Sequence, residues 1–242
     1  MVRYARGLRP AIKDRKVLAC PAGAEGDSGQ PAIEVLRDAL AHPNIEAADA
    51  TVVLSNHFVR YLLLPWNPDI VTSQEERAFA RARFVHAFGE AAQDWALQVS
   101  HARRGLPSVA CAIEPALLQV VVALIAGSPL RMRSLQPYLM AVFNQRARRP
   151  AGDAWVAMAE AGRLLLGVLS AGNWLSLRSR PLPDPAAMLS EIIEQEALLL
   201  GIESGNKEIY LHQTGDAVLD LKGLKVQDWL PRATARPLGG AP

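Results

Sequence analysis

The chain has 242 residues, of which 50% are hydrophobic and 21% are charged; this composition is globular and excludes an intrinsically disordered protein. The formal net charge of +2 is too small to indicate binding to nucleic acid or to an anionic membrane. Residues 1–16 are basic but lack the apolar stretch of a secretory signal. The longest apolar run, Leu117–Ala126, is shorter than the roughly 20 residues of a membrane-spanning helix. We therefore expect a cytoplasmic protein that does not insert into a membrane.

The first predicted elements are a strand at Lys16–Cys20, a glycine-rich loop at Ala22–Gln30 and a helix from Pro31 to about Ala41. The two cysteines, Cys20 and Cys111, lie in apolar runs that resemble strands. Buried free thiols are the usual state of such cysteines; a disulfide between them is the alternative, although nothing in the spacing requires one.

The segment Asp49–Trp66 carries two short apolar runs, Thr51–Leu54 and Phe58–Leu64, joined by Ser55-Asn56-His57. Runs rich in β-branched and aliphatic residues around such a connection predict a β-hairpin. Pro65 follows the second run and ends it.

A helix is predicted from Ser73 to Gly89, because Glu76 three residues after Ser73 completes the pattern of a capping box. Trp95–His101 and Ser108–Ile113 then predict a second hairpin.

The helix Ala116–Ala126 is apolar on all sides and is therefore expected to be buried. A strand at Leu130–Leu135 and a helix at Gln136–Arg148 follow it. The segment Arg146–Gly152 combines charge, proline and glycine, which is typical of a linker.

The carboxy-terminal half is predicted to begin with three antiparallel strands, Ala154–Ala159, Arg163–Leu169 and Trp174–Arg180, separated by glycine-containing turns. The helix Pro185–Leu200 and the strand Glu208–His212 come next. A strand meander that feeds a helix is thus expected twice, and this pattern predicts an α/β fold with mixed sheets.

Three segments carry a resemblance to a known family: VVLSNHFVRYLLLPW, the helix opening SQEERAFARARF, and WALQVSHARRGLPSVACAI leading into a helix. Together they resemble the amino half of the PilM-type and GspL-type proteins of type IV pilus assembly and type II secretion, over Asp49–Gly127. Trp155–Gly201 resembles the second actin-like repeat of that family in its order of elements. The resemblance implies an actin-like (RNase H-like) two-repeat α/β fold with a small inserted α+β subdomain.

On this basis residues 1–148 are expected to form a first lobe, with the inserted subdomain at about 73–127. Residues 149–223 are expected to form a second lobe and residues 224–242 a flexible tail. An unrelated two-domain α/β protein is the alternative for the fold.

Nucleotide-binding members of the family carry an Asp-x-Gly phosphate loop at the first turn of each repeat, where the glycine admits the phosphate and the aspartate helps to hold Mg²⁺. The corresponding turns here, Val156–Gly162 and Lys16–Gly23, have no aspartate before the glycine. We therefore predict weak or absent ATP binding and no cofactor. The five histidines also lack the spacing of a metal site. The alternative is an active ATPase or kinase of this fold, for which Asp49 and Asp153 are the nearest acids, although both precede their strands.

The resemblance further implies a non-catalytic scaffold, recruited to the inner membrane, that binds a short cytoplasmic peptide of an inner-membrane assembly subunit. In the family this peptide lies in a groove between the first hairpin and the inserted subdomain. Arg60, Tyr61, Arg77 and Arg81 are the residues that we expect near such a groove. The partner's identity, the particular apparatus and the oligomeric state are not predicted.

Overall fold

The computed structural model describes residues 1–4, 12–20, 29–43, 45–100, 102–145, 150, 152–182, 188–205, 207–214 and 219–228. Most of the expected glycine-rich loop, most of the Arg146–Gly152 linker, the start of the Pro185–Leu200 helix and the tail beyond residue 228 lie outside the described residues. The expected lobe boundaries stay a prediction.

The amino-terminal half contains three small sheets and four α-helices within the described residues. Its elements, in chain order, are β1 (Val2–Tyr4), β2 (Ile12–Arg15), α1 (Gln30–Leu40), β3 (Ala48–Leu54), β4 (Arg60–Leu64), α2 (Ser73–Phe88), the 3-10 helix η1 (Glu90–Asp94), β5 (Ala96–Val99), β6 (Ser108–Ile113), α3 (Pro115–Ala126), β7 (Leu130–Pro137) and α4 (Tyr138–Gln145). The sheets are the antiparallel pair β1–β2, the parallel pair β3–β7 and the antiparallel order β4-β6-β5.

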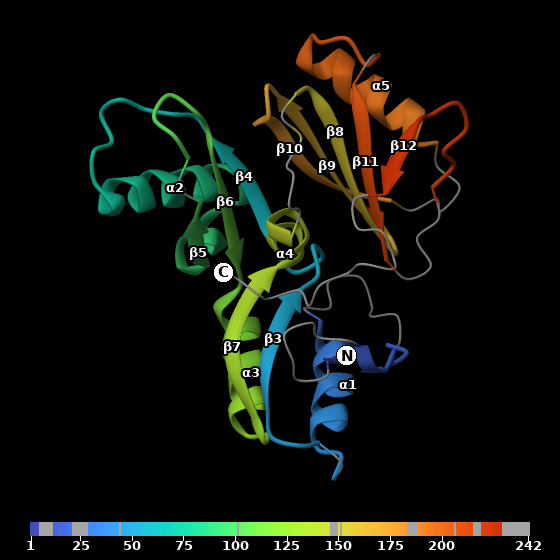
Figure 1. Ribbon diagram of the computed structural model, residues 1–242. Coiled ribbons are helices and arrows are strands. Elements are labelled where there is room, and N and C mark those ends of the chain that lie inside the picture. The colour runs from blue at the N-terminus through green and yellow to red at the C-terminus, as the bar shows by residue number, and fades with distance from the viewer. Residues whose placement is uncertain are drawn as a thin grey trace.

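The carboxy-terminal half contains one five-stranded mixed sheet with the order β10-β9-β8-β11-β12. Its elements are β8 (Ala154–Glu160), β9 (Arg163–Ser170), β10 (Asn173–Pro181), α5 (Leu189–Leu200), β11 (Glu208–Gln213) and β12 (Val226–Asp228). β8, β9 and β10 form the predicted antiparallel meander, and β11 returns parallel to β8. Figure 1 shows α4 between this sheet, the β4-β6-β5 sheet and the β3–β7 pair.

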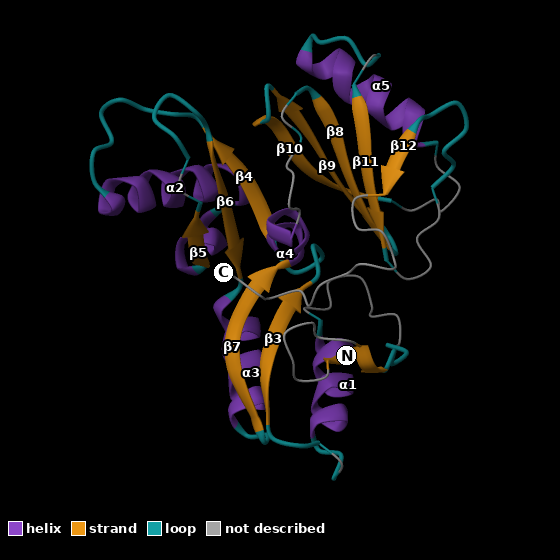
Figure 2. Ribbon diagram, in the orientation of Figure 1, coloured by secondary structure: helices purple, strands orange, loops and turns teal. Residues whose placement is uncertain are grey.

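The central strands β8 and β9 are buried on both faces, and Figure 2 shows α5 beside this sheet. Along β8 the side chains alternate: Trp155 packs with Ile192 and Ile193 of α5, whereas Met158 packs with Leu139 of α4 and other residues of the first half. Burial on both faces explains why the β8 sequence reads as a continuous apolar run instead of alternating with polar residues.

The predicted hairpin at Asp49–Trp66 is wrong, because its two strands belong to different sheets. β3 pairs in parallel with β7, and β4 pairs antiparallel with β6. Between them the Phe58 N–H donates to the Ser55 carbonyl at 3.0 Å, and this turn redirects the chain toward the second half. Among the described residues the meander that feeds a helix therefore occurs once, in the carboxy-terminal half.

The predicted strand at Lys16–Cys20 is also wrong, and Cys20 is exposed instead of buried. The β1–β2 ladder ends where the Lys16 N–H donates to the Met1 carbonyl at 2.8 Å. Beyond that bond the described residues provide no partner strand, and an apolar run without a ladder partner leaves its backbone groups to water.

Other elements lie close to their predicted positions. The β5–β6 hairpin, α1 and α2 are confirmed. The capping residue of α2 is Thr72 and not Ser73: its Oγ1 accepts from the Glu75 N–H at 3.2 Å, and Glu75 accepts from the Thr72 N–H at 2.9 Å.

The composition of helix α3 predicted burial on all sides, but the helix is buried on one side only. Leu117, Val121 and Ile125 are buried along one stripe, while Val122 is 44% exposed. β7 extends to Pro137, so the following helix begins later than predicted.

In the part of the chain that the structure describes, every helix is too short or too polar to cross a lipid bilayer.

Candidate functional site

Two features are candidates for function, and the first is a contact between two turns. The turn Ser55–His57, which follows β3, lies against the β8–β9 turn. The Asn56 N–H donates to a Glu160 carboxylate oxygen at 2.9 Å. His57 Nε2 lies 2.9 Å from the Ala161 carbonyl oxygen, to which it donates when that nitrogen carries the proton. We call these contacts the turn junction.

A hydrogen bond between two buried side chains, Asn56 and Tyr61, stabilises the turn junction. Asn56 is fully buried, and its Oδ1 accepts a hydrogen bond from the Tyr61 hydroxyl at 2.8 Å. Burial, with smaller contributions from Cys111 and Glu160, raises the pKa of Tyr61 well above its usual value. Tyr61 therefore stays a neutral donor, and the Ser55–His57 turn is fixed by the first half as well as by the second.

The turn junction covers the place where a phosphate loop is expected in a nucleotide-binding protein of this fold. Gly162 adopts φ 75°, but the His57 ring lies 3.9 Å from the position that a Cβ on Gly162 would take. A phosphate loop needs free backbone N–H groups without a competing anion, whereas here the Glu160 carboxylate and the Asn56–His57 backbone lie at the turn. The weak or absent ATP binding expected from the sequence stays a prediction.

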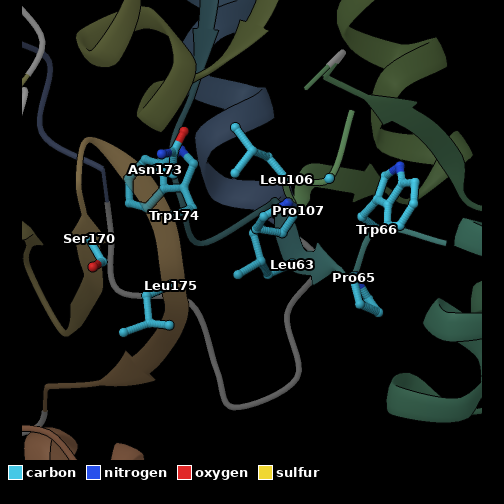
Figure 3. Close-up of a pocket in the computed structure, with 10 residues that line it drawn as sticks. Leu63, Pro65, Trp66, Leu106, Pro107, Ser170, Asn173, Trp174 and Leu175 are labelled. Atoms are coloured by element: carbon cyan, nitrogen blue, oxygen red, sulfur yellow. The ribbon is translucent and has the colours of Figure 1, made fainter. Parts of the chain in front are cut away.

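The second feature is a groove of about 540 Å³ between the end of β4 and the start of β10 (Figure 3). One wall comes from β4 and the β5–β6 loop, and the other comes from the β9–β10 turn and β10. The lining residues are Leu63, Pro65, Trp66, Gly105, Leu106, Pro107, Ser170, Asn173, Trp174 and Leu175. We call it the β4/β10 groove.

The β4/β10 groove is mainly apolar, and two of its large side chains are open to solvent. Trp66 on one wall is 44% exposed and Leu175 on the other is 45% exposed. Large apolar side chains that stay exposed in a groove are candidates for contact with another molecule.

A β-bulge explains why Leu175 points outward. The register of β10 against β9 shifts between Trp174 and Ser176, so that Leu175 is an extra residue. The neighbouring Trp174 is held inward: its ring packs over Gly167, where an added Cβ would lie 2.4 Å from it, and stands 5.1 Å from the Phe143 ring.

The four residues expected near a partner groove do not come together around it, and none of them lines the β4/β10 groove. Tyr61 is buried in the turn junction, and Arg60 donates to the His57 carbonyl at 2.9 Å. Arg81 donates from Nη1 to the carbonyls of Gln93 and Trp95, at 2.7 and 2.6 Å, and so holds η1 on α2. Arg77 lies exposed on α2. Their role in partner binding stays a prediction.

Sequence reasoning missed Trp66, Leu175, Asn56 and His57 as site residues. Trp66 was a usable signal, because tryptophan combines a large apolar ring with a polar N–H and is enriched at interfaces. The junction depends on contacts between residues about a hundred positions apart, as Asn56 and Glu160 are, and no local pattern indicates them.

No protein-family model and no curated protein matches the chain. Among solved structures, the chain is similar to the cytoplasmic domain of EpsL, an inner-membrane component of the type II secretion system of Vibrio cholerae. That match has a TM-score of 0.53 and 10% identity, and covers 81% of this chain and 74% of that one.

The chain is also similar to a chain of the PilM-PilN type IV pilus biogenesis complex, with a TM-score of 0.53 and 16% identity. The match covers 84% of this chain and 62% of that one, so the chain spans less than two thirds of that relative's length. The fold expected from the sequence is therefore confirmed: the chain has the actin-like α/β fold that these pilus and secretion proteins share.

Proposed function

We propose that this protein is a non-catalytic scaffold of a type IV pilus or type II secretion apparatus. It works at the cytoplasmic face of the inner membrane and binds an inner-membrane assembly subunit. The likeness in fold to EpsL and to the PilM-PilN complex supports this role.

The turn junction is the observation that carries the non-catalytic part of the proposal. Asn56 and His57 bond to Glu160 and Ala161 at the turn where the fold's nucleotide-binding members need open backbone N–H groups. Internal contacts thus occupy one phosphate turn, and the scaffold binds its partner without nucleotide.

Calorimetric titration of the purified chain with ATP and Mg²⁺, beside a nucleotide-binding protein of the same fold, tests this part. We expect no heat of binding up to millimolar ATP. Stoichiometric binding at micromolar affinity would instead favour an ATPase or kinase.

Partner binding needs a separate test. We expect the tagged chain to copurify from membranes of its source organism with one inner-membrane subunit of a pilus or secretion apparatus, identified by mass spectrometry. Recovery of the chain alone, under conditions that keep such an apparatus intact, would contradict the scaffold role.

A further inference from the structure

We propose that the β4/β10 groove binds an extended peptide segment as an added β-strand, and that the segment carries acidic residues beside one large apolar residue. The inference rests on the proposed scaffold role and names the surface and the chemistry of the partner. It stands on four observations: two strand edges that pair with no strand among the described residues, two exposed apolar side chains, uncharged walls, and two exposed arginines beside one wall.

The first free edge belongs to β4. Leu63 lies opposite Val109 of β6, but the Val109 carbonyl accepts from the Ser100 N–H at 2.8 Å and the Val109 N–H donates to Ser100 Oγ at 3.0 Å. Because both backbone groups of Val109 face β5, the N–H and C=O of Leu63 face the opposite edge. That edge lies at the groove.

The second free edge belongs to β10. Ala171 and Gly172, with φ of 47° and 75°, form the two-residue turn between Ser170 and Asn173. In such a hairpin the residues that flank the turn bond to each other, so the backbone of the next residue, Trp174, faces away from β9. The bulge at Leu175 extends this unpaired stretch.

β4 and β10 belong to different sheets, although some residues of the two strands lie close together. Their unpaired N–H and C=O groups can accept a strand from a partner, which is the usual way in which sheet edges recognise extended peptides. The groove opens where the end of β4 separates from the start of β10.

The uncharged walls of the groove favour an apolar side chain on the part of the peptide that lies inside it. None of the ten lining residues carries a charge, so a buried charge on the peptide would lose its hydration without a partner. Trp66 lines one wall and Leu175 the other, and a large aliphatic or aromatic side chain bound against either would cover part of its exposed area.

Charged residues at the rim of the groove favour one sign of charge on the peptide. Arg103 and Arg104 are exposed and directly precede Gly105–Pro107, which form part of one wall. On the other side, Asp153 accepts a hydrogen bond from the Ala171 N–H at 2.9 Å, so its charge is partly engaged by the backbone. The basic side of the rim therefore favours acidic residues on the peptide next to its apolar residue.

Selection of random dodecamer peptides displayed on phage, using the purified full chain, tests the proposal. We expect the selected peptides to share one large apolar residue with aspartate or glutamate within two positions of it. Synthetic copies should bind Leu175→Asp at least ten times more weakly than the natural chain, and the charge reversal Arg103→Glu with Arg104→Glu should have a similar effect.

Leu198→Asp is the matched control, because Leu198 is 84% exposed on α5 and does not line the groove. It should leave peptide affinity unchanged. Hydrogen exchange should slow on peptide binding at Leu63 and Trp174, whose N–H groups face the open edges.

A selection that yields no binder, or binders without acidic residues, would overturn the proposal, as would equal affinity for the natural chain and Leu175→Asp. The scaffold role is judged separately: a membrane subunit that still copurifies with Leu175→Asp leaves the scaffold role standing and removes only the groove. Loss of that subunit with Leu175→Asp but not with Leu198→Asp supports both.

Discussion

At the scale of single residues, the position of the Trp174 ring depends on the absence of a side chain at Gly167. The Trp174 ring occupies the space in which a Cβ on Gly167 would lie, 2.4 Å from the ring. Because Gly167 is in the middle of β9, its backbone cannot move without disturbing β8 and β10. The indole must shift instead, and with it the inward wall of the groove.

We predict that Gly167→Ala lowers the free energy of unfolding by about 1–3 kcal/mol, the usual cost of overpacking a core. Urea unfolding followed by tryptophan fluorescence measures this cost. Gly205→Ala is the control, since a Cβ there meets no atom within 4 Å. Equal stabilities of the two variants would show that Trp174 is free to move.

The two cysteines should differ sharply in reactivity. Burial raises the pKa of the Cys111 thiol to about 11, whereas Cys20 is exposed. Because the thiolate is the reacting form, a thiol reagent at pH 8 should modify one cysteine per folded chain and both after unfolding. Cys20→Ser should abolish the fast reaction, and a fast reaction that persists in this variant would place Cys111 at the surface.

At the scale of elements, the start of α2 is fixed by reciprocal bonds between Thr72 and Glu75. Hydrogen bonds from the backbone N–H groups of Val71 and Thr72 lower the pKa of Glu75. Since the folded pKa is lowered, the contribution of Glu75 is complete above its unfolded pKa of about 4.3. It is lost as the pH falls through the lower folded value.

We predict that Thr72→Ala lowers the free energy of unfolding by about 1 kcal/mol at pH 7, the usual cost of losing an N-cap. Ser73→Ala, at the first helical position, should cost less because that side chain makes no cap bond. Urea titrations at pH 7 measure both values. A larger loss for Ser73→Ala would restore the cap position predicted from the sequence.

The elements themselves were largely predictable, because their signals are local. Helix α2, the β5–β6 hairpin and the β8–β10 meander follow from apolar spacing, caps and glycine turns. Strand partners were less predictable, because a short apolar strand can bond equally well to any matching edge. β3, for example, pairs with β7, and the paired residues Thr51 and Ser134 are about 80 positions apart in the chain. Trp66 and Leu175 line one groove although they come from different halves of the chain, so no local pattern indicates that they share a site.

At the scale of the whole molecule, the turn junction joins the two halves through few atoms. Glu160 accepts from the N–H of Asn56, a fully buried residue. Removing the carboxylate would leave a backbone donor without its partner, which is costly in a buried setting. The turn junction should therefore stabilise the contact between the two halves of the chain.

We predict that Glu160→Ala lowers the free energy of unfolding by about 1–3 kcal/mol and speeds hydrogen exchange at Asn56. Glu191→Ala, at an exposed position of α5, should change neither quantity. An unchanged rate of hydrogen exchange at Asn56 in Glu160→Ala would mean that the Asn56–Glu160 hydrogen bond does not stabilise the contact between the two turns.

The two open strand edges at the groove also bear on the solubility of the protein. An unpaired edge can join the same edge of another copy, and growth of this kind leads to aggregates. Here Pro65 and Pro107 have no N–H to donate, and the bulge at Leu175 bends β10 away from a flat geometry. These features make pairing with the same edge of a second copy less favourable, while the groove between them stays open to a short partner segment.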